Sequence, residues 1–170
     1  MTDTPRRLQA GEIDAVVTLA RVVWQATYPA LISSAQIEYM LGERYAPTLI
    51  RTQLNDPDHA WWIVGAGDPV AFAHASRSGS ECKLDKLYVH PARQRQGLGA
   101  ALLDVVCDWA RAHHATRLWL QVNRGNHQAI RAYEKQGFRI LEARVFEIGR
   151  GFVMDDYVMA RSLALSSIRA

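Results

Sequence analysis

Apolar residues spaced three and four apart predict three helices in the first third of the chain. Each begins at a residue type that suits a helix start, either a side-chain cap or a proline in the first turn. The expected helices run from Asp14 to just before Pro29, from Ser33 or Ser34 through Leu41, and from Pro47 to Leu54. A short strand, Arg7–Gln9, is expected before them.

Beyond Leu54, short apolar runs bounded by turn residues are typical of strands. The turn at Gly65–Pro69 joins the first two runs into an antiparallel hairpin. The expected strands are Trp61–Val64, Val70–His74, Leu84–His90, Arg117–Val122, Ile140–Ile148 and Phe152–Ala160; the expected helices run from Leu98 to Trp109 and from Asn126 to Gln136. A strand meander followed by a crossover through a helix predicts an α/β fold with a mixed, twisted sheet of about seven strands and helices on both faces.

Length and composition narrow the class of protein. The 170 residues are 49% hydrophobic and 22% charged, so we expect one soluble globular domain spanning residues 1–170. The formal charge of +3 comes from dispersed basic residues, which does not favour a nucleic acid partner. Met1–Glu12 lacks the apolar segment of a signal peptide, and no apolar run is long enough to cross a membrane. We expect a cytoplasmic protein with no membrane association.

The two cysteines, Cys82 and Cys107, lie in apolar segments without metal-ligand spacing. Buried, reduced thiols are the expected state, and neither a disulfide nor a metal site is predicted.

The stretch from Gln94 to Gly99 joins a predicted strand to a predicted helix, and it contains two glycines and one arginine. Glycine lets a backbone approach a ligand closely, and the first N–H groups of a helix have no partner within the helix. Such a turn suits an anion such as pyrophosphate. It is not a Walker A loop, because no Gly-Lys-Ser/Thr follows, and Leu102 replaces the third glycine of a dinucleotide fingerprint.

Asn126, Ala129 and Tyr133 are spaced three and four apart, so they share one face of the predicted short helix. The tyrosine offers a phenol with an ordinary pKa of about 10, and the asparagine offers an amide. This pattern predicts a polar stripe that one extended ligand can contact.

Three segments together resemble the GNAT superfamily of acyl-CoA-dependent N-acyltransferases. Leu84–Pro91 resembles the central strand of that family, and Gln94-x-x-Gly97-x-Gly99 resembles its pyrophosphate loop. The third segment, similar to the second half of the family pattern, is Val122-x-x-x-Asn126-x-x-Ala129-x-x-x-Tyr133-x-x-x-Gly137-Phe138. The similarity is strongest from Cys82 to Phe138 and extends in element order over the whole chain.

The resemblance implies acetyl-CoA as co-substrate and a specific way of binding it. The backbone on either side of Tyr88 would bind pantetheine like an added strand, the Gln94–Gly99 loop would cradle the pyrophosphate, and Tyr133 would protonate the departing thiolate. The residues implied in cofactor binding are Leu87, Tyr88, Val89, Gln94, Arg95, Gln96, Gly97, Leu98, Gly99, Asn126, Ala129 and Tyr133.

The implied reaction is direct attack of an acceptor amine on the thioester in a ternary complex. An alkyl amine with a pKa of about 10.4 is mostly protonated at pH 7, which adds roughly 4.6 kcal/mol to the barrier unless a base or a desolvating pocket helps. Gln121 stands where family members that acetylate protein N-termini have a glutamate, and an amide cannot accept the proton. The candidates left open for the base are Asp85, Glu81, Glu147 and His90, with Asp155 and Asp156 further away.

The implied reaction also needs a site for the acceptor amine. The first two helices and the last hairpin are expected to shape its site, with Trp24, Tyr28, Glu38, Tyr39 and Glu43 as the residues concerned. We favour a primary amine of a small molecule, polyamine-like or other, over a peptide. The alternatives are a protein or peptide N-acetyltransferase and a non-catalytic acyl-CoA-binding module. Whether the chain forms a homodimer is left open.

Overall fold

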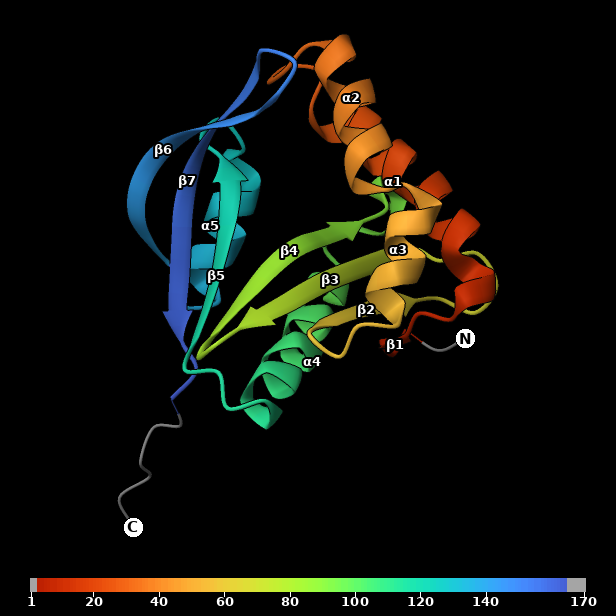
Figure 1. Cartoon of the computed structure of the whole chain (residues 1–170), viewed down its shortest axis with the longest axis vertical. Coiled ribbons are helices and arrows are strands. Elements are labelled where there is room, and N and C mark those ends of the chain that lie inside the picture. Colours follow the sequence, from red (N-terminus) through yellow and green to blue (C-terminus); the bar gives the residue numbers. More distant parts are fainter. Residues whose placement is uncertain (1–2, 165–170) are drawn as a thin grey trace.

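The computed structural model describes residues 3–164, whose strands form one seven-stranded sheet in the order β1-β2-β3-β4-β5-β7-β6 (Figure 1). All neighbouring strands are antiparallel except β4 and β5, which are parallel. The strands are β1 Arg6–Arg7, β2 His59–Val64, β3 Ala71–Ser78, β4 Glu81–Val89, β5 Arg117–Asn123, β6 Arg139–Gly149 and β7 Phe152–Ser162. The predicted mixed sheet and its strand number are confirmed.

Helices cover both faces of the sheet, as predicted (Figure 1). They are α1 Ile13–Thr27, α2 Ser34–Arg44, α3 Pro47–Leu54, α4 Leu98–Ala112 and α5 His127–Lys135. The first three pack on one face, where the core includes Trp24, Ile37, Ile50 and Phe72. The other two cover the opposite face, where Leu102, Leu118 and Ile130 belong to a second core. Both cysteines are buried and free, in agreement with the sequence.

The helix starts follow the predicted signals with one correction. Ser33 caps α2 by accepting a hydrogen bond from the Gln36 backbone at 3.1 Å. Asp14 is not the cap of α1, because a 3-10 turn, Ala10–Glu12, runs directly into the helix and Glu12 takes that position. Asp14 lies in the first turn instead, where a carboxylate still interacts favourably with the helix dipole.

Two irregularities in β4 position the site. The strand pairs with β5 only through Glu81, Cys82 and Lys83, so beyond Lys83 the two strands diverge, as Figure 1 shows. Its pairing with β3 shifts register between His74 and Ala75: His74 pairs with Lys86 and Ala75 with Leu84, which leaves Asp85 as a bulged residue.

The bulge changes which side chains face the first three helices. Side chains normally alternate between the two faces of a strand, but Asp85 and Lys86 both contact His74. After the bulge, alternation resumes: Leu87 and Val89 pack against the core beneath α4, and Tyr88 packs against the core beneath α1.

Within residues 3–164, no helix has the length and apolar character needed to cross a bilayer.

Candidate active site

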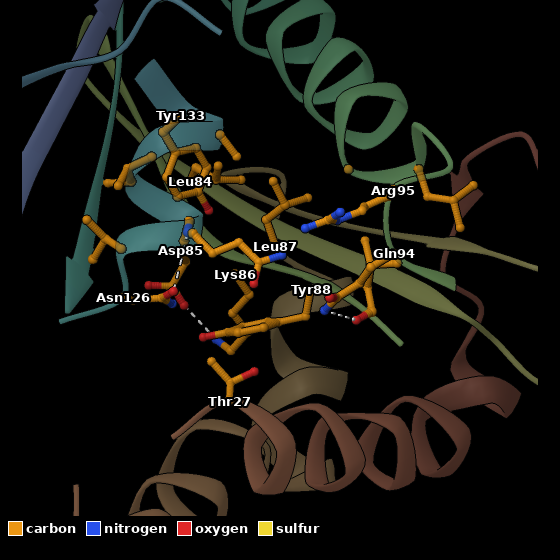
Figure 2. A pocket seen from close by; sticks show the side chains of 18 of the residues that line it. Thr27, Leu84, Asp85, Lys86, Leu87, Tyr88, Gln94, Arg95, Asn126 and Tyr133 are labelled. Atoms are coloured by element: carbon orange, nitrogen blue, oxygen red, sulfur yellow. Dashed lines mark hydrogen bonds and ion pairs between the residues drawn. The ribbon is translucent and has the colours of Figure 1, made fainter. Parts of the chain in front are cut away.

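A cavity of about 370 Å³ lies where β4 and β5 separate, bounded by the starts of α4 and α5 (Figure 2). This volume lies in the usual range for small-molecule sites. Of the residues predicted to bind cofactor, those lining it are Leu87, Tyr88, Val89, Gln94, Arg95, Gly97, Leu98, Gly99, Asn126, Ala129 and Tyr133. Segments that are well separated in sequence therefore meet around one space.

Gln96 was also predicted to bind the cofactor, but it does not line this cavity in the described part of the chain. Its side-chain oxygen accepts a hydrogen bond from Arg93 Nε at 2.8 Å, while Arg93 itself lines the cavity. The local reason is the 3-10 turn Pro91–Arg93, which brings the two side chains together before α4 begins. Arg93 is a lining residue that the sequence reading missed, although its charge and its place beside the loop were visible.

The loop before α4 lines the cavity and contains two residues in the left-handed conformation. Gly97 precedes the first helical residue and has φ of +80°, and Arg95 has φ of +63°, so the chain turns sharply twice. Left-handed residues interspersed in a turn form concave arrays of N–H donors that bind anions, and the helix start adds its own unpaired donors. In Figure 2, Arg95 and Gln94 lie at this end of the cavity.

The divergence from β5 leaves one edge of β4 without a partner strand from Leu84 to Val89. Backbone N–H and C=O groups on a free edge can hydrogen-bond an extended ligand, which is the geometry the sequence implied for pantetheine. Gln94 Nε2 lies 3.4 Å from the Val89 carbonyl oxygen, so the loop side chain reaches the end of this edge (Figure 2).

The opposite end of the cavity is formed by α5. Asn126 is the N-cap rather than a helical residue, and its side-chain oxygen accepts a hydrogen bond from the Ala129 N–H at 3.3 Å. The Tyr133 ring packs against Phe138 at a centroid distance of 5.4 Å, and the residue is half-buried. Burial raises the pKa of the Tyr133 phenol, so the hydroxyl keeps its proton at neutral pH.

A buried polar chain beside the cavity was missed by the sequence reading. His59 Nδ1 lies 2.9 Å from His74 Nε2, and His74 Nδ1 lies 3.2 Å from an Asp85 oxygen. The same oxygen lies 2.5 Å from the ammonium of Lys86, which is 5% exposed. Burial lowers the pKa of His74 to about 4. In the sequence, only His74 and Lys86, two polar residues within apolar strands, indicated this series of polar contacts.

These contacts make Asp85 a poor base. Burial alone raises the pKa of its carboxyl, but the Lys86 ammonium and the His74 hydrogen bond outweigh that effect and hold the pKa well below its ordinary value. Lys83 Nζ adds a third contact at 3.3 Å. A carboxylate with three such partners is stabilised as the anion, so it has little tendency to take a further proton.

The structure separates the remaining candidates for the base. Glu81 pairs with Arg117 at 2.5 Å at the start of β4, and Glu147 is exposed on β6. The His90 side chain accepts the Ala92 N–H at 3.0 Å and caps the 3-10 turn. Asp155 lies 3.5 Å from Arg124 at the surface, whereas Asp156 is buried.

The residues expected on the acceptor side divide into two groups. Trp24 and Tyr28 are buried and also line a smaller second cavity, and the Tyr28 hydroxyl lies 2.8 Å from that of Tyr88. Glu38 instead forms an ion pair with Arg21 at 2.6 Å on the solvent-exposed face of its helix. Trp24 and Tyr28 therefore line the site, whereas Glu38 does not. The Tyr39 hydroxyl donates a hydrogen bond to the Ile148 carbonyl oxygen at 2.8 Å, outside both cavities.

Comparison with known proteins identifies the family to which the chain belongs. The model of the Acetyltransferase (GNAT) family matches residues 23–138. An uncharacterized N-acetyltransferase of Mycobacterium tuberculosis is 31% identical over 156 residues, covering 89% of this chain and 98% of that protein. The [Ribosomal protein bS18]-alanine N-acetyltransferase of Escherichia coli is 40% identical over 72 residues, covering 42% of this chain and 49% of that protein.

Among solved structures, PaiA N-acetyltransferase from Thermoplasma acidophilum, in complex with coenzyme A, has a TM-score of 0.78 at 22% identity. The match covers 93% of this chain and 97% of that one. The two proteins therefore share one fold. The chain belongs to the GNAT family, and it is an N-acetyltransferase.

Proposed function

We propose that this chain transfers the acetyl group of acetyl-CoA to a primary amine of a small molecule, by direct attack in a ternary complex. The observation that carries the proposal is the cavity along the free edge of β4, with N–H donors at one end and a phenol at the other. Pyrophosphate would lie at the start of α4, pantetheine would lie along Leu87 and Val89, and the thioester would point toward Tyr133.

Tyr133 is proposed to act on the leaving group. As the C–S bond breaks, negative charge develops on sulfur, and a phenol hydroxyl that is still protonated can donate a hydrogen bond and then its proton. The raised pKa of Tyr133 makes it a weak acid, so most of its effect comes from stabilising the developing thiolate. Asn126 would contact the cofactor arm through its amide nitrogen, since its oxygen caps α5.

A small acceptor is supported by the size and enclosure of the acceptor side. The second cavity measures about 50 Å³ and is lined by packed aromatic and polar side chains, which suits an amino group with few atoms around it. The peptide alternative draws on the similarity to the ribosomal protein acetyltransferase, which spans 42% of this chain. Gln121 disfavours the peptide alternative, because it replaces the glutamate of family members that acetylate protein N-termini and an amide cannot accept the proton.

A panel of amines tests the substrate class. We expect the purified chain to release free thiol from acetyl-CoA with at least one small primary amine and to be slower with peptides that have a free N-terminus. Thiol release is followed by colour, and the acetylated product is identified by mass. Faster turnover of the peptides would favour the alternative acceptor class. Tight acetyl-CoA binding without turnover of any amine or peptide would favour the non-catalytic module.

A further inference from the structure

The second cavity adjoins the first at the point where β4 and β5 part. The two cavities share Tyr28, Asp85, Tyr88 and Gln121 in their linings, so a group held in the smaller one lies next to the larger one. The smaller cavity is further lined by Asp156 from β7. It is therefore placed to hold a group that reacts with a thioester lying in the larger cavity.

Asp156 is buried in an unusual state. It is 3% exposed, and its Oδ1 atom is buried without a hydrogen-bond partner among the described residues. Its backbone pairs with that of Asn123, so its side chain lies on the same sheet face as the side chains of Asn123 and Gln121, which also line the cavity. A buried carboxylate oxygen without a partner is costly, and a ligand N–H would satisfy it.

We infer that this cavity receives the amino group of the acceptor and that Asp156 is the general base that takes its proton. The inference rests on the proposed acetyl transfer and assigns a residue and an acceptor class to it. Asp85 lines the same cavity, but its carboxylate is already held by Lys86, His74 and Lys83. Gln121 also lines it, but an amide cannot accept the proton.

The surroundings of Asp156 give its carboxylate suitable basicity. Burial raises the pKa of Asp156 to about 6, and the neighbouring charge of Asp155 adds to the rise. Arg44 on α2, Lys83 on β4 and a hydrogen bond with the Gln121 side chain act in the opposite direction. The other ionisable groups in the cavity lining are Tyr28 on α1 and Lys83, Asp85 and Tyr88 on β4. A base with a pKa just below the working pH is mostly deprotonated and is still able to take a proton.

The reaction balances with these groups. The amine nitrogen forms a bond to the thioester carbonyl carbon, and the C–S bond breaks. The acceptor reacts as the free amine after its ammonium form has released one proton to solvent, and the proton that nitrogen loses as the amide forms goes to Asp156. The thiolate takes a proton from Tyr133. Asp156 then gives its proton to solvent, and Tyr133 recovers one from solvent.

The charges around the cavity also indicate the acceptor class. Asp85 is already neutralised by its partners, which leaves Asp156 facing Arg44, for which no ion pair occurs within the described residues. A polyamine would bring a second positive charge close to Arg44 and Lys83, and like charges repel at such range. The acceptor is therefore a monoamine whose other groups are neutral or anionic.

Asp156→Asn tests the base, with Asp155→Asn as the matched control. Asp155 is the adjacent residue, is exposed and lies 3.5 Å from Arg124 on the other sheet face. With the most rapidly acetylated amine of the panel at saturation, we expect Asp156→Asn to lower kcat about 10²–10⁴-fold with unchanged acetyl-CoA affinity. At pH 8, where Asp156 is ionised with or without the neighbouring charge, Asp155→Asn should keep the wild-type kcat.

The pH profile adds a readout that a structural role would not change. In the wild type, kcat should fall below a pH of about 6 as Asp156 becomes protonated, and this fall should be absent from the residual activity of Asp156→Asn. Because a raised carboxyl pKa means that the ionised form destabilises the fold, Asp156→Asn should melt at a higher temperature than the wild type at pH 8. That gain should shrink as the pH falls through 6 and disappear only below the ordinary carboxyl pKa of about 4, where Asp156 is protonated in both the folded and the unfolded chain.

The acceptor class is tested with butylamine and 1,4-diaminobutane, which differ by one amino group. We expect at least tenfold higher kcat/KM for butylamine; a value for the diamine that equals or exceeds it overturns the charge argument. Wild-type kcat in Asp156→Asn, with acetyl-CoA turnover intact, overturns only the base assignment. If the wild-type chain acetylates no amine at all, the proposed function fails, and the base assignment fails with it.

Discussion

Replacing Tyr133 by phenylalanine should lower kcat about 10²–10⁴-fold while leaving the affinity for acetyl-CoA almost unchanged. The ring packs against Phe138 and lines the larger cavity, and phenylalanine preserves both contacts. What is lost is one hydroxyl, which matters only when charge develops on the leaving sulfur. A group used in the transition state and not in the ground state affects kcat and not the dissociation constant.

Steady-state kinetics and calorimetry separate these two effects. Tyr157→Phe is the control, because Tyr157 is also half-buried and packs on the same core, but it lies on β7 outside the lining of the larger cavity. We expect its kcat to match the wild type. A Tyr133→Phe variant with wild-type turnover would remove the assigned role, and weakened cofactor binding with unchanged kcat would make Tyr133 a binding residue instead.

Replacing Asp85 by alanine should destabilise the fold by about 3–5 kcal/mol at pH 7. The change leaves the Lys86 ammonium, which is 5% exposed, without its counter-charge, and it removes the acceptor for His74 Nδ1. A buried charge without a partner is among the most costly defects in a protein interior. Urea or guanidinium unfolding gives the free energy directly.

Two further measurements distinguish this explanation from simple loss of packing. The deficit should shrink as the pH rises toward 10, because Lys86 can then become neutral without cost to the folded state. The double variant Asp85→Leu/Lys86→Met should recover most of the lost stability, since it removes both charges together. Failure of the double variant to recover would mean that the polar chain through His74 contributes more than the ion pair does.

The helices, the strands and the Gln94–Gly99 loop could be predicted from the sequence because their signals are local. The spacing of apolar residues, the Ser33 cap and the glycines before α4 depend on neighbours within a few positions, and the structure agrees with each. The prediction of Asp14 as the cap of α1 was wrong for an equally local reason, because a 3-10 turn runs directly into the helix.

The buried polar contacts could not be predicted from the sequence because they depend on strand register. Alternation along β4 places Asp85 and Lys86 on opposite faces, and only the bulge opposite β3 puts both next to His74. Asp156 and Asp155 are equivalent in sequence, yet pairing with β5 turns one into a cavity and the other to solvent. Pairing between distant strands decides which of the two carboxylates lines the cavity, and no local pattern encodes it.

Calorimetric titration with acetyl-CoA tests most directly whether the cavity between β4 and β5 binds the cofactor. The wild type should release or absorb heat at a single site and melt at a higher temperature when the ligand is present. Gly97→Val should bind about 10–100-fold more weakly, because a β-branched residue is strained at φ of +80° and its side chain obstructs the approach of phosphate to the backbone. Gly67→Val, at φ of +87° in the β2–β3 turn, should bind like the wild type. No heat and no thermal shift with the wild type, or equal affinity in Gly97→Val, would contradict the account.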